Sequence, residues 1–470
     1  MSKTIELIND KIKNKKARVV TADEMTRIVR ETGPERAAEK VDVVTTGTFG
    51  AMCSSGAWLN FGHSDPPIRM NKVFLNDVEA YTGVAAVDAY IGATQASETQ
   101  GIRYGGAHVI EDLVGRMPVI LKASSRGTDC YPRKRIVTEI TLDDLNQAVL
   151  SNPRNAYQRY NAASNTSDQT LFTYMGKLLP RCGNINFSGA GEFSPLMNDP
   201  DFRTIGIGTK IFLGGGIGHV IGSGTQHSPE NGFATLMVQG DLKGMSGEFL
   251  RAAVFHGYGC TLYVGIGVPI PVLDAEVARA SGVADSEIFV SVIDYSVPSR
   301  RRPTLRKASY AELKSGSVEL NGRRVRTSPL SSFRVARLIA GILKQWIETG
   351  AFLLSPAAEP LSLKGAAGPM VQKTPHRGRP SSGGRPVLSG QDFMAWDESV
   401  CHSCGACLSI CPSGVFSRDE DWMIGADVSL CSECLQCENV CPVGAIRLRE
   451  SPPHHRARSK GKIRMEENPI

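Results

Sequence analysis

Eight of the twelve cysteines in this 470-residue chain lie between residues 401 and 441. They form two copies of one spacing, in which three cysteines recur at every third position and a Cys-Pro pair follows: Cys401, Cys404, Cys407 and Cys411, then Cys431, Cys434, Cys437 and Cys441. Each CxxCxxCxxxCP run is typical of thiolate ligands to a cubane iron–sulfur cluster. This segment is therefore predicted to fold around clusters and to carry electrons.

The repeat resembles the bacterial-type two-cluster ferredoxins over about residues 396 to 449. In such proteins the fourth cysteine of each run binds the other cluster. The resemblance implies two 4Fe-4S clusters, one on Cys401, Cys404, Cys407 and Cys441 and one on Cys431, Cys434, Cys437 and Cys411. A zinc ribbon would leave the third cysteine and the Cys-Pro pair unexplained. A disulfide framework would require an oxidising compartment. A short hairpin, with strands near Phe416 and Ile424, is expected between the copies.

The chain is longer than the roughly 250–300 residues at which a single core stops growing, so at least two domains are expected. Residues 355–393 lose hydrophobic periodicity and are rich in Pro, Gly, Ser and basic residues, as flexible tethers are. The predicted organisation is a body over 1–353, a linker over 354–393, a ferredoxin domain over 394–450 and a basic disordered tail over 451–470. The tail lacks interleaved aromatic residues, so nucleic-acid binding is not expected.

The most apolar stretch, residues 262–273, is broken by glycines and prolines and is shorter than the roughly 18 residues of a membrane span. The N-terminus lacks the apolar core of an export signal. Free thiols and iron–sulfur ligands also fit a reducing compartment. The sequence thus predicts a cytoplasmic protein with no membrane partner.

Helix and strand signals alternate in the body. Capping boxes predict helices over 21–30 and 145–150, and an apolar face predicts a helix over 332–349. Strand-like runs cover 41–44, 119–121, 236–238, 261–264 and 288–293, and Asn321-Gly322 indicates a hairpin. The expected fold is a mixed α/β body of undetermined topology, followed by a small α+β dicluster ferredoxin domain.

Four cysteines lie outside the repeat. Cys260 precedes an apolar strand and is expected to be a buried structural thiol, whereas Cys182 is left open between a structural and a reactive role. Cys130 stands in a turn beside Arg133 and Lys134, and nearby cations stabilise a thiolate. Cys53 lies among small residues that allow backbone amides to approach a bound anion. Spacing alone does not decide whether Cys53 and Cys130 have a functional or a structural role.

Nucleotide-binding signatures are absent from the sequence: no window fits GxGxxG, and no GK[ST] follows a glycine-rich loop. His63, ten residues after Cys53, is either an acid–base group or a hydrogen-bonded loop histidine.

Several segments of the body are similar to the homocysteine biosynthesis family of methanogens and other anaerobes, with the match covering about residues 1–353. The segments are 43–57, 60–67, 105–113, 127–132, 225–229 and 265–271. Members convert L-aspartate semialdehyde to homocysteine with a sulfide-derived persulfide and ferredoxin electrons. Their two characteristic cysteines match Cys53 and Cys130, and the resemblance implies that Cys130 carries the persulfide. Some members have a nucleotide-sensing module after the core and a separate ferredoxin-like partner, whereas here a dicluster ferredoxin is fused.

The resemblance implies a reductive sulfurtransferase with Cys130, Cys53 and His63 as catalytic residues. His108 is a second candidate proton donor, and Arg133 is the candidate for the substrate carboxylate, unless it is an ordinary surface arginine. The expected partners are the aldehyde, a sulfide or persulfide donor and an external electron donor; the chain could form a homo-oligomer. Two alternatives stay open: a sulfur carrier and electron-relay scaffold serving a partner enzyme, and an iron–sulfur oxidoreductase acting on another carbonyl substrate. An enclosed pocket at Cys130 would favour the enzyme, and a flat surface there the carrier.

Overall fold

A computed structural model of the chain describes residues 3–365, 368–373, 394–420 and 422–448. The chain divides into two compact units, 1–369 and 370–470. The first is a mixed α/β body and the second a small α+β module, as the sequence predicts. The predicted tail, 451–470, lies outside the described residues.

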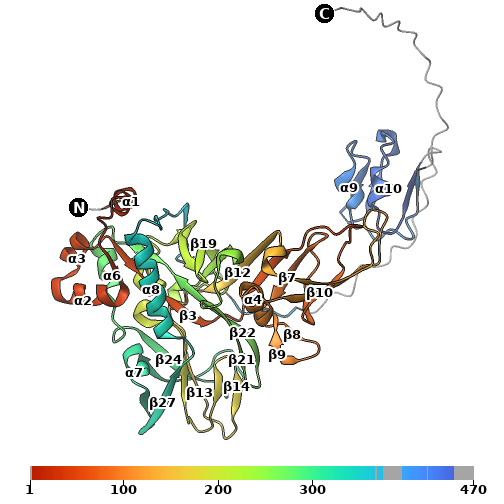
Figure 1. The fold of residues 1–470 in the computed structure, drawn as a ribbon. Helices are drawn as coiled ribbons and strands as arrows, with labels where there is room; N and C mark the ends of the chain where they lie inside the picture. The colour runs from red at the N-terminus through yellow and green to blue at the C-terminus, as the bar shows by residue number, and fades with distance from the viewer. Residues whose placement is uncertain (1–2, 366–367, 374–393, 421, 449–470) are drawn as a thin grey trace, which may run out of the picture. The chain divides into compact units, whose positions relative to one another are not determined.

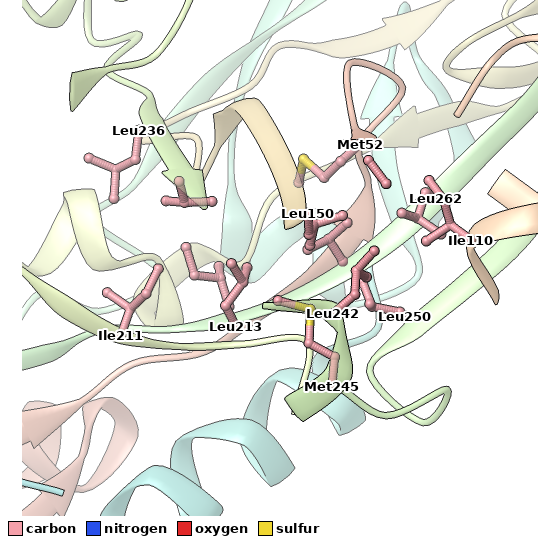
Figure 2. Close-up of a cluster of buried hydrophobic side chains, with 14 of the residues drawn as sticks. Met52, Ile110, Leu150, Ile211, Leu213, Leu236, Leu242, Met245, Leu250 and Leu262 are labelled. Carbon is pink, nitrogen blue, oxygen red and sulfur yellow. The ribbon is translucent and has the colours of Figure 1, made fainter. Parts of the chain in front are cut away.

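A nine-stranded antiparallel sheet forms the centre of the body (Figure 1). Its strands run in the order β21 (Leu250–Phe255), β22 (Gly259–Gly267), β18 (Lys210–Leu213), β19 (Gly216–Ser223), β20 (Leu236–Asp241), β12 (Gln147–Asn155), β4 (Gly56–Asn60) and β7 (Asp88–Gly92), and β3 (Thr48–Ala51) pairs with β22 beside this path. Apolar side chains from these strands, from other strands of the body and from its helices form the main buried cluster, of which Figure 2 shows a part. Burial of apolar surface of this kind is the dominant favourable term in folding.

The body also contains two six-stranded sheets. The first has the order β11 (Arg135–Ile140), β10 (Val119–Ser124), β5 (Lys72–Leu75), β6 (Val78–Ala80), β8 (Ala96–Ser97) and β9 (Gly101–Gly105). The second has the order β25 (Thr304–Ser309), β24 (Phe289–Asp294), β13 (Ala162–Ser164), β16 (Ile185–Phe187), β27 (Arg323–Pro329) and β26 (Ser317–Leu320). A three-stranded sheet, β1 (Val19–Thr21), β2 (Val43–Thr45) and β23 (Pro269–Pro271), lies near the N-terminal helices.

The longest helix of the described residues, α8 (Phe333–Glu348), packs on β22, β3 and β1 (Figure 1). The approach is close: a Cβ at Gly47 would lie 2.1 Å from the Ala336 carbonyl oxygen, so only glycine fits there. The other body helices are α1 (Ile5–Lys13), α2 (Ala22–Thr32), α3 (Pro34–Lys40), α4 (Gly106–Val114), α5 (Pro195–Asn198), α6 (Ala275–Ser281) and α7 (Tyr310–Lys314). α2, α3 and α6 pack against one another, and α4 packs on β21 and β22.

Most of the predicted elements are confirmed. The helices expected over 21–30 and 332–349 are α2 and α8, and the five strand-like runs are β2, β10, β20, β22 and β24. Asn321 and Gly322, at φ 53° and 72°, join β26 to β27 as the hairpin turn predicts. The helix expected over 145–150 is wrong. The capping box there forms only a short turn of 3-10 helix, and the following residues enter β12, because β4 and β20 pair with that strand on both sides.

The second unit contains β29 (Met394–Trp396), α9 (Ala406–Ile410), β30 (Phe416–Arg418), β31 (Ile424–Ala426), α10 (Gln436–Val440) and β32 (Ile446–Leu448). β29 pairs with β32, and β30 pairs with β31 as the expected hairpin. The module has its own buried cluster, in which cysteines contact Trp396, Val415 and Phe416.

The first part of the segment assigned to the linker packs on the body. β28 (Glu359–Pro360) pairs with β17 (Gly206–Ile207), and Leu361 is buried in the main cluster. The buried ring of His227 also makes a 2.9 Å hydrogen bond to the Ser362 carbonyl. Ordered structure therefore continues past residue 354, since these residues find partners on the body. Residues 374–393 of the predicted linker lie outside the described residues.

None of the helices among the described residues is both long enough and apolar enough to cross a membrane.

Leu343 and Leu338 provide a matched test of the α8 interface. Leu343 is fully buried, whereas Leu338 on the same helix is 38% exposed. We expect Leu343→Ala to lower the free energy of unfolding by about 2–5 kcal/mol because it leaves a cavity. Leu338→Ala should change it by about 0.5 kcal/mol or less. Urea denaturation followed by circular dichroism measures both, and equal losses would contradict the packing of α8 described above.

Candidate active site and cluster module

Cys53 stands in the short connection between β3 and β4, and this connection is firmly held. The Met52 amide donates to the Leu262 carbonyl at 2.8 Å, and the Ala93 amide donates to the Ser55 carbonyl at 2.8 Å. The Met52 side chain is buried in the same cluster as Leu262 (Figure 2). The position of Cys53 is therefore set by strand pairing on both sides and by an apolar anchor.

The Cys53 thiol is half-buried and lies 3.3 Å from the Thr261 hydroxyl. It lines a cavity of about 310 Å³, at the small end of the roughly 300–1,000 Å³ of ligand pockets. The described residues that line it come from segments far apart in the sequence: Ala51, Cys53, Ser54, Arg154, Tyr157, Tyr160, Tyr174, Met175, Ser188, Gln226, Tyr258 and Leu330. The cavity thus suits a small polar ligand next to a thiol.

Arg154 is the one cation in that described lining. It lies near the end of β12, where the register with β20 shifts between Asn152 and Asn155, and a bulge of this kind re-aims side chains. The Arg154 amide donates to the Asn152 side-chain oxygen at 3.1 Å. Its guanidinium donates through Nη1 to Gln226, while Nε is buried without a hydrogen-bond partner. The Ser54 hydroxyl is also buried and unpartnered.

Tyrosines form much of the remaining lining. Burial raises the pKa of Tyr157 to about 12, and Arg154 opposes the rise only in part. Burial likewise raises the pKa of Tyr160. The Tyr174 hydroxyl lies 2.8 Å from the hydroxyl of Tyr295. Tyr157 and Tyr160 therefore remain neutral near pH 7 and can act as hydrogen-bond donors in the cavity.

Small residues around Cys53 serve packing. A Cβ at Gly56 would lie 2.2 Å from the Tyr90 hydroxyl and 2.6 Å from the Ile91 carbonyl oxygen. A Cβ at Gly50 would lie 2.8 Å from the Ser331 hydroxyl. These glycines allow neighbouring side chains and strands to approach closely, which is a different role from the anion-binding amides that the sequence suggests.

Cys130 is exposed on the connection between β10 and β11. Its thiol lies 3.6 Å from the Thr128 hydroxyl, in a turn closed by backbone hydrogen bonds between Thr128 and Tyr131. Cys130 is not among the residues that line the Cys53 cavity. The two cysteines thus have different surroundings: Cys53 is half-buried beside a cavity, and Cys130 is exposed.

His63 and Arg133 lie next to the Cys130 turn. The His63 ring stacks on Tyr131 with centroids 6.0 Å apart. The Arg133 guanidinium donates to the Pro66 carbonyl at 3.0 Å and to the Asp65 carbonyl. The structure therefore brings Cys130, His63 and Arg133 together, but Arg133 already uses its guanidinium to tie two loops.

The other candidate residues have structural partners. The His108 Nδ1 accepts from the Gly105 amide at 3.1 Å at the start of α4, and burial lowers its pKa. The buried Cys260 thiol donates to the Ile102 carbonyl at 3.0 Å, and burial raises its pKa. Cys182 is buried in the core of the second six-stranded sheet. Cys260 is structural as expected, and the burial of Cys182 favours the same role.

The cysteine repeats gather into two sets in the second unit. Cys401, Cys404, Cys407 and Cys441 line one cavity, and Cys411, Cys431, Cys434 and Cys437 line another. The fourth cysteine of each run therefore joins the other run, as the resemblance to two-cluster ferredoxins implies. Backbone amides donate to ligand sulfurs, from Ala445 to Cys441 at 3.2 Å and from Val415 to Cys411 at 3.4 Å. Amide–sulfur hydrogen bonds tune the reduction potential of a bound cluster.

Among the described residues, no group of His, Cys, Asp or Glu side chains could hold a single metal ion. The two cysteine sets nevertheless fit iron–sulfur clusters, because a cubane spreads its four ligands over four irons and needs wider spacing than one ion.

Sequence reasoning missed Arg154 and the tyrosines. They come from the end of β12, from the residues after it and from two turns, and they carry no spacing that sets them apart. The only local sign is the pair Tyr157 and Tyr160 shortly after Arg154.

Two cysteine sets that fit clusters, together with a half-buried thiol beside a cavity, indicate an iron–sulfur protein. Comparison with protein families agrees: the homocysteine biosynthesis enzymes, described as sulfur-incorporating, match residues 17–354, and 4Fe-4S binding domains match residues 393–416 and 425–447. The chain belongs to the family of sulfur-incorporating homocysteine biosynthesis enzymes. No solved structure matches it.

Two relatives share more than half of their aligned residues with this chain. The L-aspartate semialdehyde sulfurtransferase of Methanosarcina acetivorans is 58% identical over 372 residues, which are 79% of this chain and 74% of the relative. The protein of the same name from Methanocaldococcus jannaschii is 55% identical over 374 residues, 76% of this chain and 73% of the relative. The iron–sulfur subunit of L-aspartate semialdehyde sulfurtransferase from M. acetivorans is 52% identical over 31 residues, 7% of this chain and 24% of that protein.

Thiol alkylation tests the contrast between the cysteines of the body. We expect iodoacetamide to modify Cys130 first, because it is exposed, then the half-buried Cys53, and to leave Cys182 and Cys260 largely unmodified under native conditions. Peptide mass spectrometry over a time course measures the order. Modification of Cys260 as fast as Cys130 would contradict the burial described here.

Pairs of substitutions test the crossed ligation. If Cys407 and Cys441 bind one cluster, the variant that lacks both should keep the other and contain about four irons per chain. The variant that lacks Cys407 and Cys411 also removes two cysteines, but it takes one ligand from each set. It should therefore lose both clusters. Iron analysis and electron paramagnetic resonance after reduction measure the difference. The reverse pattern would show that each run binds its own cluster.

Proposed function

We propose that the chain is an L-aspartate semialdehyde sulfurtransferase that forms L-homocysteine with reducing power from two 4Fe-4S clusters. The observation that carries this proposal is the half-buried Cys53 thiol in a cavity of about 310 Å³. The family and the names of the two relatives support the choice of substrate. When bound, the clusters supply electrons one at a time.

The overall reaction consumes one aldehyde, one hydrogen sulfide, two electrons and two protons, and it yields one thiol and one water. The exposed Cys130 carries the incoming sulfur as a persulfide, since a donor can reach it there. The terminal persulfide sulfur attacks the aldehyde carbon, and the Cys53 thiolate then attacks the Cys130 sulfur. The sulfur–sulfur bond breaks, which leaves a hemithioacetal on the substrate and a Cys53–Cys130 disulfide.

The remaining steps close the cycle. The hemithioacetal loses water to give a thioaldehyde, which two electrons and two protons reduce to the thiol. Hydrosulfide attacks the disulfide and regenerates the Cys130 persulfide and the Cys53 thiolate. These exchanges require the turn that carries Cys130 to approach the Cys53 cavity. His63, which stacks on Tyr131 in that turn, is the proposed proton carrier.

The proposed partners follow from this chemistry. They are the aldehyde, a sulfide or persulfide source and an external reductant that recharges the clusters. The reducing cytoplasm is the proposed location, because it keeps thiols and clusters in the required state.

The exposure of Cys130 also favours a second candidate, a sulfur carrier that passes its persulfide to a partner enzyme. The purified chain separates the two candidates. Homocysteine formation from sulfide, the aldehyde and a reductant supports the enzyme, whereas a chain that forms the persulfide but no homocysteine supports the carrier.

Single cysteine substitutions test the assignment of roles. We expect Cys53→Ser and Cys130→Ser each to lower sulfide-dependent homocysteine formation by on the order of 100-fold or more, because each removes a thiol that makes or breaks a bond. Cys260→Ala, which changes a structural thiol, should keep most of the activity. After treatment with polysulfide, the added sulfur should be found on Cys130 in the wild type and in Cys53→Ser by mass spectrometry. Wild-type activity in Cys130→Ser would remove Cys130 from the mechanism.

A further inference from the structure

Arg154 and Ser54 line the Cys53 cavity, and among the described residues Arg154 Nε and the Ser54 hydroxyl are buried without a hydrogen-bond partner. Leaving a buried donor unpaired costs free energy, and the cost is greater when the group is charged. Native structures rarely keep such atoms unpaired unless a ligand or water completes them. The hydrogen bonding of these two residues, which form part of the cavity wall, is therefore incomplete.

The charge of the cavity identifies the ligand more closely. Arg154 is the only charged side chain in the described lining besides the ionisable thiol, and no carboxylate lies there to balance it. A guanidinium is always protonated and presents donors in a planar fork that matches a carboxylate. The cavity therefore favours a ligand with a carboxylate at one end.

The protein fixes the guanidinium before any ligand arrives. The β12 bulge sets the backbone, and Gln226 accepts a hydrogen bond from Nη1. Because Gln226 is neutral, it orients the group without cancelling its charge. The Arg133 guanidinium, in contrast, donates hydrogen bonds to the Asp65 and Pro66 carbonyls.

The tyrosines suit the other end of an amino acid. Tyr157, Tyr160, Tyr174 and Tyr258 line the cavity, so a large part of its wall is aromatic. An ammonium group is attracted to aromatic faces, and the neutral hydroxyls can accept its hydrogen bonds. A cavity with one arginine, several tyrosines and no carboxylate thus fits a small zwitterion.

We propose that Arg154 binds the α-carboxylate of the amino-acid substrate and so presents the aldehyde to the sulfur chemistry at Cys53. This inference rests on the proposed function. Arg154, and not Arg133, is thereby assigned to bind the substrate carboxylate. Gln226 is assigned as a residue that positions the Arg154 guanidinium. The same contact selects α-amino-acid aldehydes against simple aldehydes, since only the former present a carboxylate to the Arg154 guanidinium.

A pair of substrates isolates the contact. 3-Aminopropanal is L-aspartate semialdehyde without its carboxylate. We expect Arg154→Gln to raise the KM for L-aspartate semialdehyde by roughly 100-fold, with a smaller effect on kcat, because a charged contact to the substrate is lost. The variant should leave the weak turnover of 3-aminopropanal nearly unchanged. Arg154→Lys should recover part of the loss because it restores the charge but lacks the fork.

Arg159→Gln is the matched control. Arg159 lies five positions along the chain, yet it lines a different cavity with Asn231 and Lys307. This variant should keep the wild-type KM for both substrates. Equal losses on both substrates in Arg154→Gln and Arg154→Lys would indicate a merely structural role and overturn the inference, as would a normal KM in both variants.

Binding without turnover keeps the inference separate from the proposed reaction. L-Homoserine has the same carboxylate and ammonium but an alcohol in place of the aldehyde. Calorimetry should show that the full-length protein binds L-homoserine and that Arg154→Gln weakens binding by roughly 100-fold, while Arg159→Gln does not. Arg154-dependent binding in a protein that forms no homocysteine would refute the reaction and support the carboxylate site. Homocysteine formation with binding that does not depend on Arg154, or no binding by the wild type, would refute the site. Melting temperatures check that each variant is folded.

Discussion

The antiparallel pairing of β3 with β22 supports most of the site. β3 leads into Met52, which packs in the core, and then into Cys53. β22 provides the Leu262 carbonyl that accepts from the Met52 amide and the Thr261 hydroxyl that contacts the Cys53 thiol. On its other side the loop enters β4, which pairs with β12, and β12 carries Arg154. One continuous sheet therefore fixes the thiol and the guanidinium relative to each other. Moving either would break ladder hydrogen bonds that each contribute about 0.5–1.5 kcal/mol net.

The two units divide the chemistry between them. The body holds the thiols and the cavity, and the second unit holds the cysteine sets for clusters. An aldehyde and sulfide cannot give a thiol without electrons, so a body of this kind needs a reductant. One polypeptide thus carries both the thiols and the cysteine sets for clusters, so the two are made in equal amounts.

The sequence predicted what depends on local spacing. The cysteine runs, the α8 apolar face and the Asn321-Gly322 turn each encode their structure within a few residues, and each is present. The helix expected over 145–150 failed because pairing with β4 and β20 outweighed a capping signal. Arg154 was missed for a related reason. Its importance comes from side chains that the fold brings to it from distant turns, and no local pattern records that arrangement.

The contrast between an exposed Cys130 and a half-buried Cys53 beside a cavity fits the opposing demands of the proposed sulfur transfer. Loading a persulfide requires access to a donor in solution, and the exposed turn provides it. A thioaldehyde, in contrast, would react with water or with other thiols if it formed in the open, so the carbon–sulfur bond should form where solvent is excluded. A single site could not meet both demands without opening and closing around each intermediate. In the proposed cycle, two cysteines on separate connections are joined by thiolate exchange, so that the sulfur enters at the exposed turn and reacts at the cavity.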